Sequence, residues 1–258
     1  MFSFTENLIV IFASLISIIG VFIFSCLFSQ LVKTYRCLKA KEKIFWHMTI
    51  VRALFGVFGA CVGVWAIGYS EDLNNDVVNG ETWFSHCTIS ITIAFFMFES
   101  LVVTLSDFYY GGFQVLLNLH HWLALMNYVT AVVVGKMHFF GCSGLVLEMT
   151  TPFSAICWTL LKCRMSETKL WKTNQFILVH LFHVRSVIEV YFWYVTYKNY
   201  NSIITQVPFY FLMLIYGGLF LVTFLMTPYW TYRKTQQLIM PFDFNFQNPI
   251  ANGDVKRK

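Results

Sequence analysis

The chain contains 258 residues, of which 57% are hydrophobic, 19% are aromatic and only 12% are charged, and its formal net charge is +5. A soluble domain has about 25% charged residues, so this composition excludes a water-soluble enzyme and predicts a protein with several membrane spans. The excess positive charge lies in short loops rather than on one patch, which argues against nucleic-acid binding. Membrane lipids are the partners that we expect.

Seven apolar segments approach the length of about 20 residues that a helix needs to cross a bilayer. In chain order they cover residues 8–32, 44–69, 83–106, 113–134, 138–161, 172–197 and 207–230. The first follows Glu6 rather than a basic leader and lacks a small-residue cleavage site, so we predict a retained span. The sequence therefore predicts an all-α polytopic membrane protein, with an N-terminal helix in 1–32, a membrane domain in 33–230 and a cytosolic tail in 231–258.

The basic residues orient these spans, because cytosolic loops are enriched in lysine and arginine. Most of them lie in loop 33–43, in loop 162–171 and in the tail, which fall on one side of a seven-span arrangement. Loop 70–82, on the opposite side, contains four acidic residues and no basic one. We therefore predict a cytosolic C-terminus and a lumenal N-terminus.

Several ionisable residues lie inside the predicted spans, where such groups are costly and usually face a bundle interior or a wet cavity. They are Arg52, Glu99, His120, His121, Glu148, His180, His183, Arg185 and Glu189. A helical rise of about 1.5 Å per residue places most of them about 10–17 Å below the cytosolic face, with Glu148 deeper. Antiparallel spans thus bring polar groups to one level, which predicts a polar chamber open to the cytosol.

The charged residues also have purely structural interpretations, which the sequence leaves open. Arg185 and Glu189 are four residues apart, so they can pair within one helix. Arg52 and Glu99 lie on different spans and can neutralise each other as a buried pair. Either arrangement would stabilise the bundle without binding a ligand.

The histidines allow similar alternatives. His180 and His183 share one helix face and can bond a neighbouring helix instead of a ligand. His120 and His121 point roughly 100° apart on a helix, so at most one aims straight into the chamber. Four histidines at one level also suggest a metal site, but only the HLFH segment and the doublet have ligand-like spacing. We therefore expect no metal.

Three segments make the chain resemble the TLC-domain family, which includes ceramide synthases and other lipid proteins of the endoplasmic reticulum. They are the histidine doublet in "LNLHHWLALMNYV", the segment "EMTTPF" in the fifth span and the segment "FHVR" in the sixth. The resemblance implies seven helices, of which six form a chamber that takes acyl-CoA from the cytosolic side. It also implies that His120 and His121 act in acyl transfer, as nucleophile or general base, and that Glu148 belongs to the catalytic site.

One departure from the family pattern bears on the acyl acceptor. Thr151 stands where ceramide synthases have the second aspartate of an acidic segment, so a sphingoid amine fits poorly. The predicted substrate-binding residues are Arg52, Glu99, His180, His183 and Arg185. Because arginine is a good partner for phosphate, we expect acylation of an anionic glycerophospholipid precursor in the endoplasmic reticulum membrane, for instance of glycerophosphoglycerol to lysophosphatidylglycerol. Acyl-CoA would be the co-substrate.

Two non-catalytic alternatives stay open, of which the resemblance implies the first. One is a cargo receptor that carries lysosomal enzymes from the endoplasmic reticulum to the Golgi, with coat and retrieval machinery as partners; the other is a lipid sensor. A receptor needs a lumenal recognition surface, but the predicted lumenal segments are short. The terminal "GDVKRK" has lysine at the third-last position and no second lysine just before it, so a dilysine retrieval signal is incomplete.

Overall fold

The computed structural model describes residues 3–112, 114–243, 245 and 246, and within them the chain is helical between short connections, with no strand. Five helices are long and continuous: α1 (Phe4–Ser29), α3 (Ala40–Gly68), α5 (Trp83–Tyr110), α6 (Val115–Val134) and α9 (Lys169–Lys198). Two further passes are composite. One consists of α7 (His138–Gly144), the 3₁₀ segment η1 (Leu145–Thr150) and α8 (Thr151–Lys162), and the other of α11 (Phe209–Phe220), the π-helical segment η2 (Leu221–Met226) and α12 (Thr227–Ile239). The predicted all-α class is confirmed.

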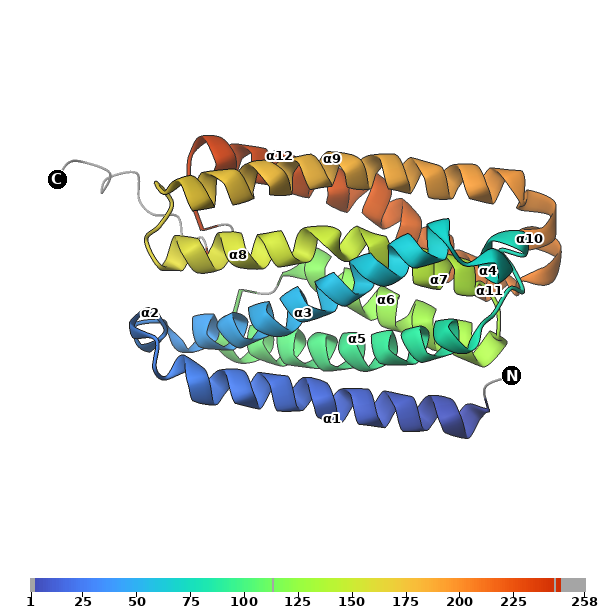
Figure 1. Cartoon of the computed structure of the whole chain (residues 1–258), viewed down its shortest axis with the longest axis horizontal. Coiled ribbons are helices and arrows are strands. Elements are labelled where there is room, and N and C mark those ends of the chain that lie inside the picture. The colour runs from blue at the N-terminus through green and yellow to red at the C-terminus, as the bar shows by residue number, and fades with distance from the viewer. Residues whose placement is uncertain (1–2, 113, 244, 247–258) are drawn as a thin grey trace.

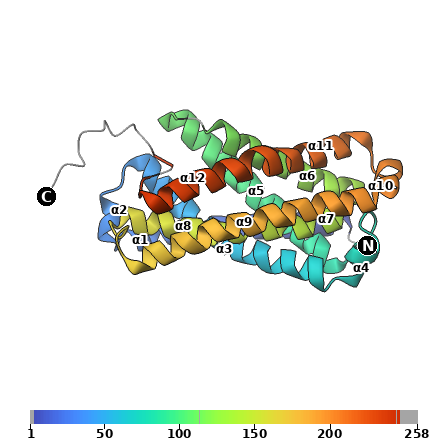
Figure 2. The same cartoon turned by 90° about the horizontal axis from the view of Figure 1, so that it is seen from above.

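The seven passes run along the long axis of the molecule, so the connections collect at its two ends (Figure 1). We call one the basic end: it holds α2 (Lys33–Arg36) and the connection from α8 to α9. The opposite, acidic end holds α4 (Glu71–Asn75), α10 (Tyr200–Gln206) and the start of α1. Seen from above, α6, α11 and α12 lie on one side of α9, and α3 and α4 on the other (Figure 2).

Six of the passes are long and apolar enough to cross a membrane, within the part of the chain that the structure describes. They are α1, α3, α5, α7 with η1 and α8, α9, and α11 with η2 and α12. The seventh pass, α6, has 20 residues and does not belong to this group. Its polar residues, Asn118, His120, His121 and Asn127, dilute its apolar content. The prediction of about seven spans therefore corresponds to these six passes and α6.

Side chains at the helix starts and glycines at the helix ends set the bounds of the passes. Ser3 Oγ accepts a hydrogen bond from the Glu6 N–H at 3.2 Å, and Glu6 accepts one from the Ser3 N–H at 2.6 Å, which caps α1. Thr168 caps α9 in the same manner, accepting from the Trp171 N–H. At its end, α6 stops at Gly135, whose φ of 64° suits a residue without a side chain.

The closest helix contact in the bundle involves a row of glycines on α3. A methyl group at Gly63 would lie 2.3 Å from the amide nitrogen of Val146 in η1, and one at Gly59 would lie 3.2 Å from the Leu145 carbonyl oxygen. Gly56 faces Pro152 at the start of α8 with similarly little space, 2.7 Å. Small residues let two backbones approach closely inside a membrane, and this contact fixes η1 against α3.

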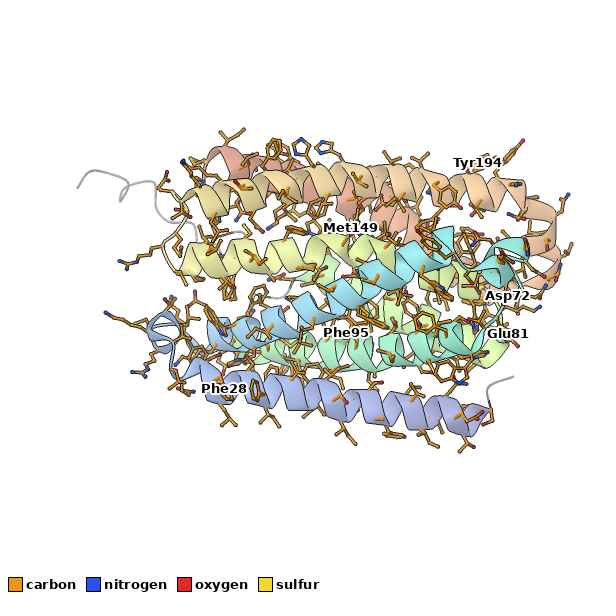
Figure 3. The ribbon with its side chains drawn as sticks, viewed as in Figure 1. Phe28, Asp72, Glu81, Phe95, Met149 and Tyr194 are labelled. Atoms are coloured by element: carbon orange, nitrogen blue, oxygen red, sulfur yellow. The ribbon has the colours of Figure 1, made fainter. Side chains whose placement is uncertain are left out.

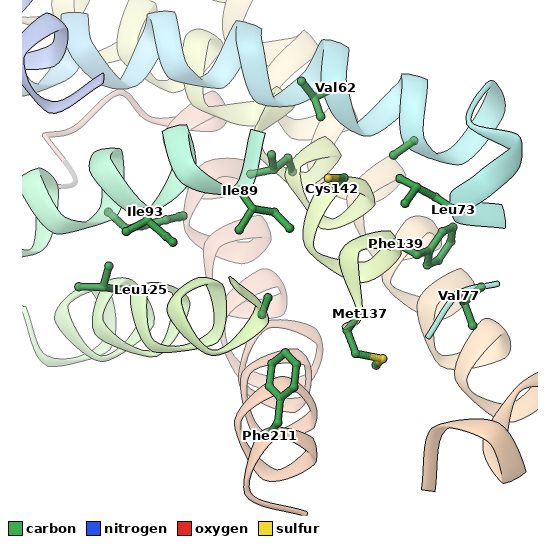
Figure 4. Packing of buried hydrophobic residues seen from close by; sticks show 14 of the residues in the cluster. Val62, Leu73, Val77, Ile89, Ile93, Leu125, Met137, Phe139, Cys142 and Phe211 are labelled. Atoms are coloured by element: carbon green, nitrogen blue, oxygen red, sulfur yellow. The ribbon is translucent and has the colours of Figure 1, made fainter. Parts of the chain in front are cut away.

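A buried apolar cluster joins six of the seven passes, together with α4 and α10, toward the acidic end (Figure 4). Its members include Val62 of α3, Ile89 and Ile93 of α5, Leu125 of α6, Phe139 and Cys142 of α7 and Phe211 of α11. Each is at most 9% exposed. This cluster closes the bundle at one end, whereas the polar residues of the spans lie nearer the other.

The predicted boundary of the tail at residue 231 is not a boundary in the structure, because α12 continues to Ile239. The segment that follows is tied to the basic end. Lys162 forms ion pairs with Glu42 of α3 at 2.5 Å and with Asp243 at 2.6 Å. Phe246 packs edge-on against Phe45 of α3, with 5.3 Å between the ring centroids. Residues 231–246 therefore belong, where described, to the helical body.

Candidate functional site

A cavity of about 460 Å³, which we call the polar chamber, lies between α3, α5, α6, η1, α8, α9 and α12. Small-molecule sites usually have volumes of about 300–1,000 Å³. Six of the eight residues that the sequence predicts for the site line the chamber: Arg52, Glu99, His120, His121, Glu148 and Arg185. Among the described residues of α1, none lines it. The implied arrangement, with six passes forming a chamber and the N-terminal helix outside it, is what the structure shows.

Glu99 is the centre of a buried charged group. Its Oε1 atom accepts a hydrogen bond from Arg52 Nε and lies 3.6 Å from His121 Nε2. The two terminal nitrogens of Arg52 donate no hydrogen bond within the described part of the chain, and the guanidinium lies over the Phe45 ring at 5.0 Å. The predicted Arg52–Glu99 pair therefore exists, and Arg52 can still donate to a ligand.

The environment of His121 leaves one ring nitrogen without a hydrogen-bond partner among the described residues. The imidazole is only 6% exposed, and its Nδ1 atom has no hydrogen-bond partner among the described residues. A carboxylate facing Nε2 favours the tautomer with the proton on that nitrogen. Nδ1 then has a buried lone pair to which no described residue donates.

His120 occupies a different position from its neighbour. The two imidazole centroids are 5.4 Å apart, and the His120 ring stands nearly perpendicular to Phe96 and to Trp230, at 6.4 and 6.3 Å. His120 is partly exposed and lines both the polar chamber and a second cavity. The two histidines thus point in different directions, as adjacent residues on a helix should. His121 faces the Glu99 group, and His120 faces the junction of two cavities.

Glu148 reaches the chamber from η1, where the pass is not α-helical. Its Oε2 atom accepts a hydrogen bond from Thr151 Oγ1 at 2.7 Å. The irregular turn directly precedes Pro152, whose missing N–H falls within the first residues of α8, where a helix leaves its N–H groups unbonded. Thr151, which replaces a carboxylate of the family pattern, therefore acts here as a hydrogen-bond donor to Glu148.

Arg185 is held in a network that joins three elements. Its Nε atom donates to Glu189 Oε1 and to Thr227 Oγ1, both at 3.0 Å, and its Nη1 atom donates to the Leu147 carbonyl at 3.2 Å. Thr227 in turn donates to Glu189 at 2.6 Å. The predicted intrahelical pair is confirmed, and it fixes the guanidinium at the edge of the chamber.

The structure does not bring His180 and His183 into the chamber. Both are exposed on the outer face of α9, and neither lines the cavity. Each Nδ1 atom lies 2.8 Å from a carbonyl oxygen one turn earlier, that of Phe176 or Val179. Their depth along the span matches the sequence analysis, but their side of the helix faces away from Arg185.

Lys234 lines the chamber and was not predicted as a site residue. It is 5% exposed, and its ammonium group lies 3.1 Å from Gln237 Oε1. The sequence analysis assigned it to the tail, because α12 becomes polar there. Its spacing from Thr227 and Trp230, seven and four residues, puts all three on one helix face, and this signal could have identified it.

A second cavity of about 170 Å³, the apolar cavity, adjoins the polar chamber. The two share Phe96, His120, Glu148 and Arg185. Away from this junction the walls of the apolar cavity are almost entirely hydrophobic, including Leu123, Met137, Phe140, Phe211, Ile215 and Val222. The polar groups at the junction therefore stand between a charged compartment and a hydrocarbon-like one.

A sequence model of the TLC domain matches residues 4–235. Protein CLN8 of Canis lupus familiaris is 37% identical over 256 aligned residues, which cover 95% of this chain and 89% of that protein. Protein CLN8 of Homo sapiens is 36% identical over 254 residues, with the same coverage of 95% and 89%. TLC domain-containing protein 4-B of Xenopus laevis is 23% identical over 139 residues, or 52% of this chain. No solved structure matches the chain significantly. Since the domain match spans most of the sequence, the chain belongs to the TLC-domain family.

Proposed function

We propose that this protein is an acyltransferase of the endoplasmic reticulum membrane, which transfers an acyl group from acyl-CoA to a hydroxyl of an anionic glycerophospholipid precursor such as glycerophosphoglycerol. The observation that supports this most directly is the junction of the two cavities at His120, Glu148 and Arg185. An acyl thioester has an apolar chain on one side of its carbonyl and a polar carrier on the other. The junction offers matching surroundings on both sides.

The charges of the polar chamber favour an anionic acceptor. Its lining contains three positive side chains, Arg52, Arg185 and Lys234, against two carboxylates, Glu99 and Glu148. Arg52 has the most donors left for a phosphate, because only its Nε atom bonds Glu99. A glycerophosphodiester supplies the phosphate for this guanidinium and, a few bonds away, a hydroxyl for the histidines.

The reaction transfers the proton of the acceptor hydroxyl and replaces the carbon–sulfur bond of the thioester with a carbon–oxygen bond. A histidine of the doublet removes the proton of the acceptor hydroxyl as its oxygen attacks the thioester carbonyl. The tetrahedral intermediate collapses with cleavage of the carbon–sulfur bond, and the CoA thiolate takes the proton back from the imidazolium. His121 suits the role of base, since Glu99 faces its Nε2 atom and no described residue donates to its buried Nδ1 atom. His120, at the junction, contacts the acyl carbonyl.

The first test measures acyl transfer by the purified full-length protein in lipid nanodiscs, with radiolabelled acyl-CoA and glycerophosphoglycerol. We expect His121→Ala and His120→Ala each to lower the turnover number at least about 100-fold, the usual contribution of a general base. His180→Ala is the matched control, because His180 is exposed on the outer face of α9, and it should retain wild-type turnover. Equal product yields from wild type and both doublet variants would contradict the proposal.

The same assay separates the enzyme from its two rivals. Sphinganine and glycerol, offered in place of glycerophosphoglycerol, should give little product, because neither supplies a phosphate for Arg52. A cargo receptor would show no turnover with any acceptor, and its crosslinks to lysosomal enzymes would survive loss of both histidines. A lipid sensor would retain bound acyl lipid without releasing product.

A further inference from the structure

A second group of ionisable residues lies at the acidic end, away from the polar chamber. Glu81 precedes α5, His86 lies in its first turns and His138 begins α7. One ligand atom from each of the three lies within 4.8 Å of the others. Glu81 can be located at the end of the bundle near Asp72 (Figure 3). In the sequence, His138 lies between Met137 and Phe139, two members of the core cluster. None of the three lines either cavity of the candidate site.

The two imidazoles are packed together and one is already bound to the carboxylate. His86 Nε2 lies 3.1 Å from Glu81 Oε2, and the centroids of the His86 and His138 rings are 4.5 Å apart. His138 is completely buried, with 0% exposure. Its Nδ1 atom lies 2.8 Å from Ser85 Oγ, whereas its Nε2 atom has no hydrogen-bond partner among the described residues.

The hydrogen bonds of Ser85 decide which His138 nitrogen has a lone pair. Ser85 Oγ accepts from the Thr82 N–H and donates to the Thr82 carbonyl, both at 2.9 Å, as part of the cap of α5. With its single proton used there, the hydroxyl accepts from His138 Nδ1–H. The proton of the neutral imidazole is then on Nδ1, and Nε2 presents a buried lone pair with no donor facing it. A buried acceptor of this kind is costly unless something binds it.

We propose that Glu81, His86 and His138 bind a divalent transition-metal ion of the zinc type. Two imidazole nitrogens and one carboxylate oxygen are a ligand set that zinc prefers, and zinc sites with three protein ligands complete their coordination with water. Tetrahedral bonds of about 2.0–2.1 Å require ligand atoms about 3.3 Å apart. Glu81 Oε2 and His86 Nε2, 3.1 Å apart, already meet this requirement, and the His138 ligand atom lies within 4.8 Å of the others, so the site must contract around His138. The Glu81 side chain is 31% exposed, so water can reach the fourth position beside it.

Two further features support a cation at this position. Metal-binding histidines usually donate their second ring nitrogen to a neighbouring oxygen, which fixes ring and tautomer, and Ser85 provides that oxygen for His138. The connection from α3 to α5 also has four acidic residues and no basic one. Within it, the Asn79 N–H donates to Asp76 at 2.9 Å and holds the pKa of that carboxyl below its usual value. Asp76 therefore stays negatively charged, and Lys136, which bonds Asn79 of the same connection, offsets part of the charge there.

The site would join parts of the chain that are distant in sequence. Glu81 belongs to the connection after α4, His86 to α5 and His138 to α7. A bound ion replaces the ring contact between the two imidazoles with metal–ligand bonds, so it fastens the α3–α5 connection and the start of α7 to one another. This role is structural, and it does not depend on the acyl-transfer activity proposed above.

The test measures zinc directly. Full-length protein, purified with a tag that contains no histidine and equilibrated with buffered zinc, is assayed for bound zinc by mass spectrometry of the element. We expect about one zinc per wild-type chain, and at least about a tenfold loss of affinity in Glu81→Gln and in His138→Gln, because loss of even an outer-shell partner of a ligand costs about 10–100-fold. Cobalt substitution should give the visible absorption of a tetrahedral site in wild type only.

Matched controls keep this result interpretable. Glu71→Gln, in the same acidic connection, and His180→Gln, on the outer face of α9, make the same replacements elsewhere and should retain wild-type zinc. Glu81→Gln guards against misfolding, because its side chain is the least buried of the three. Zinc should raise the melting temperature of wild type and of both controls but not of the site variants. Absence of stoichiometric zinc in wild type, or equal loss in His180→Gln, would overturn the proposal.

Discussion

Each of the two arginines inside the bundle has a glutamate as its partner, but the pairs are built differently. Arg185 and Glu189 lie on one helix, and Thr227 completes their network. Arg52 and Glu99 lie on different helices, and their pair has fewer additional hydrogen bonds. An arginine whose donors are largely satisfied holds the structure together, whereas one with free donors can bind a ligand. Of the two arginines, Arg52 is therefore the one better able to bind an anion.

The Arg52–Glu99 pair can be tested by a double-mutant cycle. Removing one partner of a buried ion pair costs about 3–5 kcal/mol, because the other charge is left uncompensated. We expect Glu99→Gln and Arg52→Gln each to lower the melting temperature of the detergent-solubilised protein. The double variant should be clearly more stable than the sum of both losses implies. Strictly additive losses, measured by thermal unfolding of all four proteins, would show that the two residues do not interact.

The sequence predicts the depth of these residues better than their direction. Depth follows from counting residues along a span, and six of the eight predicted site residues do meet in the chamber. Direction requires a contrast between the apolar and polar faces of a helix. Lipid is as apolar as a protein interior, so α9 gives little such contrast, and the outward direction of His180 and His183 could not be read from their neighbours in the sequence.

At the scale of elements, two passes are interrupted close to the site. The 3₁₀ segment η1 supplies Glu148, and the π-helical segment η2 precedes Thr227, which bonds Arg185 and Glu189. Interruptions of this type are frequent at functional sites. Pro152 lies at the start of α8, next to the first of these interruptions. The glycines on α3 that fix η1 in place were not predicted, because a close backbone contact becomes visible only when both partners are in position.

The glycine contact predicts a selective loss of stability. Gly63→Ala places a methyl group where the Val146 backbone lies, 2.3 Å away, so α3 and η1 must separate. We expect a loss of about 1–3 kcal/mol, the usual cost of overpacking, and reduced acyl transfer, because η1 positions Glu148. Gly68→Ala is the control on the same helix, since a methyl group there meets nothing within 4 Å. Similar melting temperatures for both variants would contradict this account.

At the scale of the whole molecule, the chamber and the apolar cavity form one path along the bundle, from the basic end toward the core cluster. A closed path of this kind would accept acyl chains only up to a limiting length. The apolar end is closed by Met137, Phe140 and Phe211. Chain selectivity should therefore depend on residues of α7 and α11, far from the histidines.

Gly144 provides the variant for this expectation. It lines the apolar cavity, and a methyl group there meets nothing within 4 Å, so Gly144→Leu should fill the cavity without a clash. Each methylene that it excludes should weaken binding by about 0.8 kcal/mol, or about fourfold. We expect KM to rise for long-chain acyl-CoA and to change little for short chains. Gly217→Leu adds the same bulk to an exposed position of α11, and an identical shift in that variant would contradict the assignment of the cavity.

Because of the ion pairs of Lys162, a group attached near residue 246 lies closer to the polar chamber than a group attached near the start of α1. Asp243 is bound to Lys162, and Asn245, two residues later, lines the polar chamber. A force or a bulky group applied at Phe246 thus acts next to a residue in the wall of the cavity. At the other terminus it acts on α1, which has no described residue in either cavity. Fluorescent fusions and tethers attached directly after Phe246 should disturb ligand binding, and the same attachments placed before Ser3 should not.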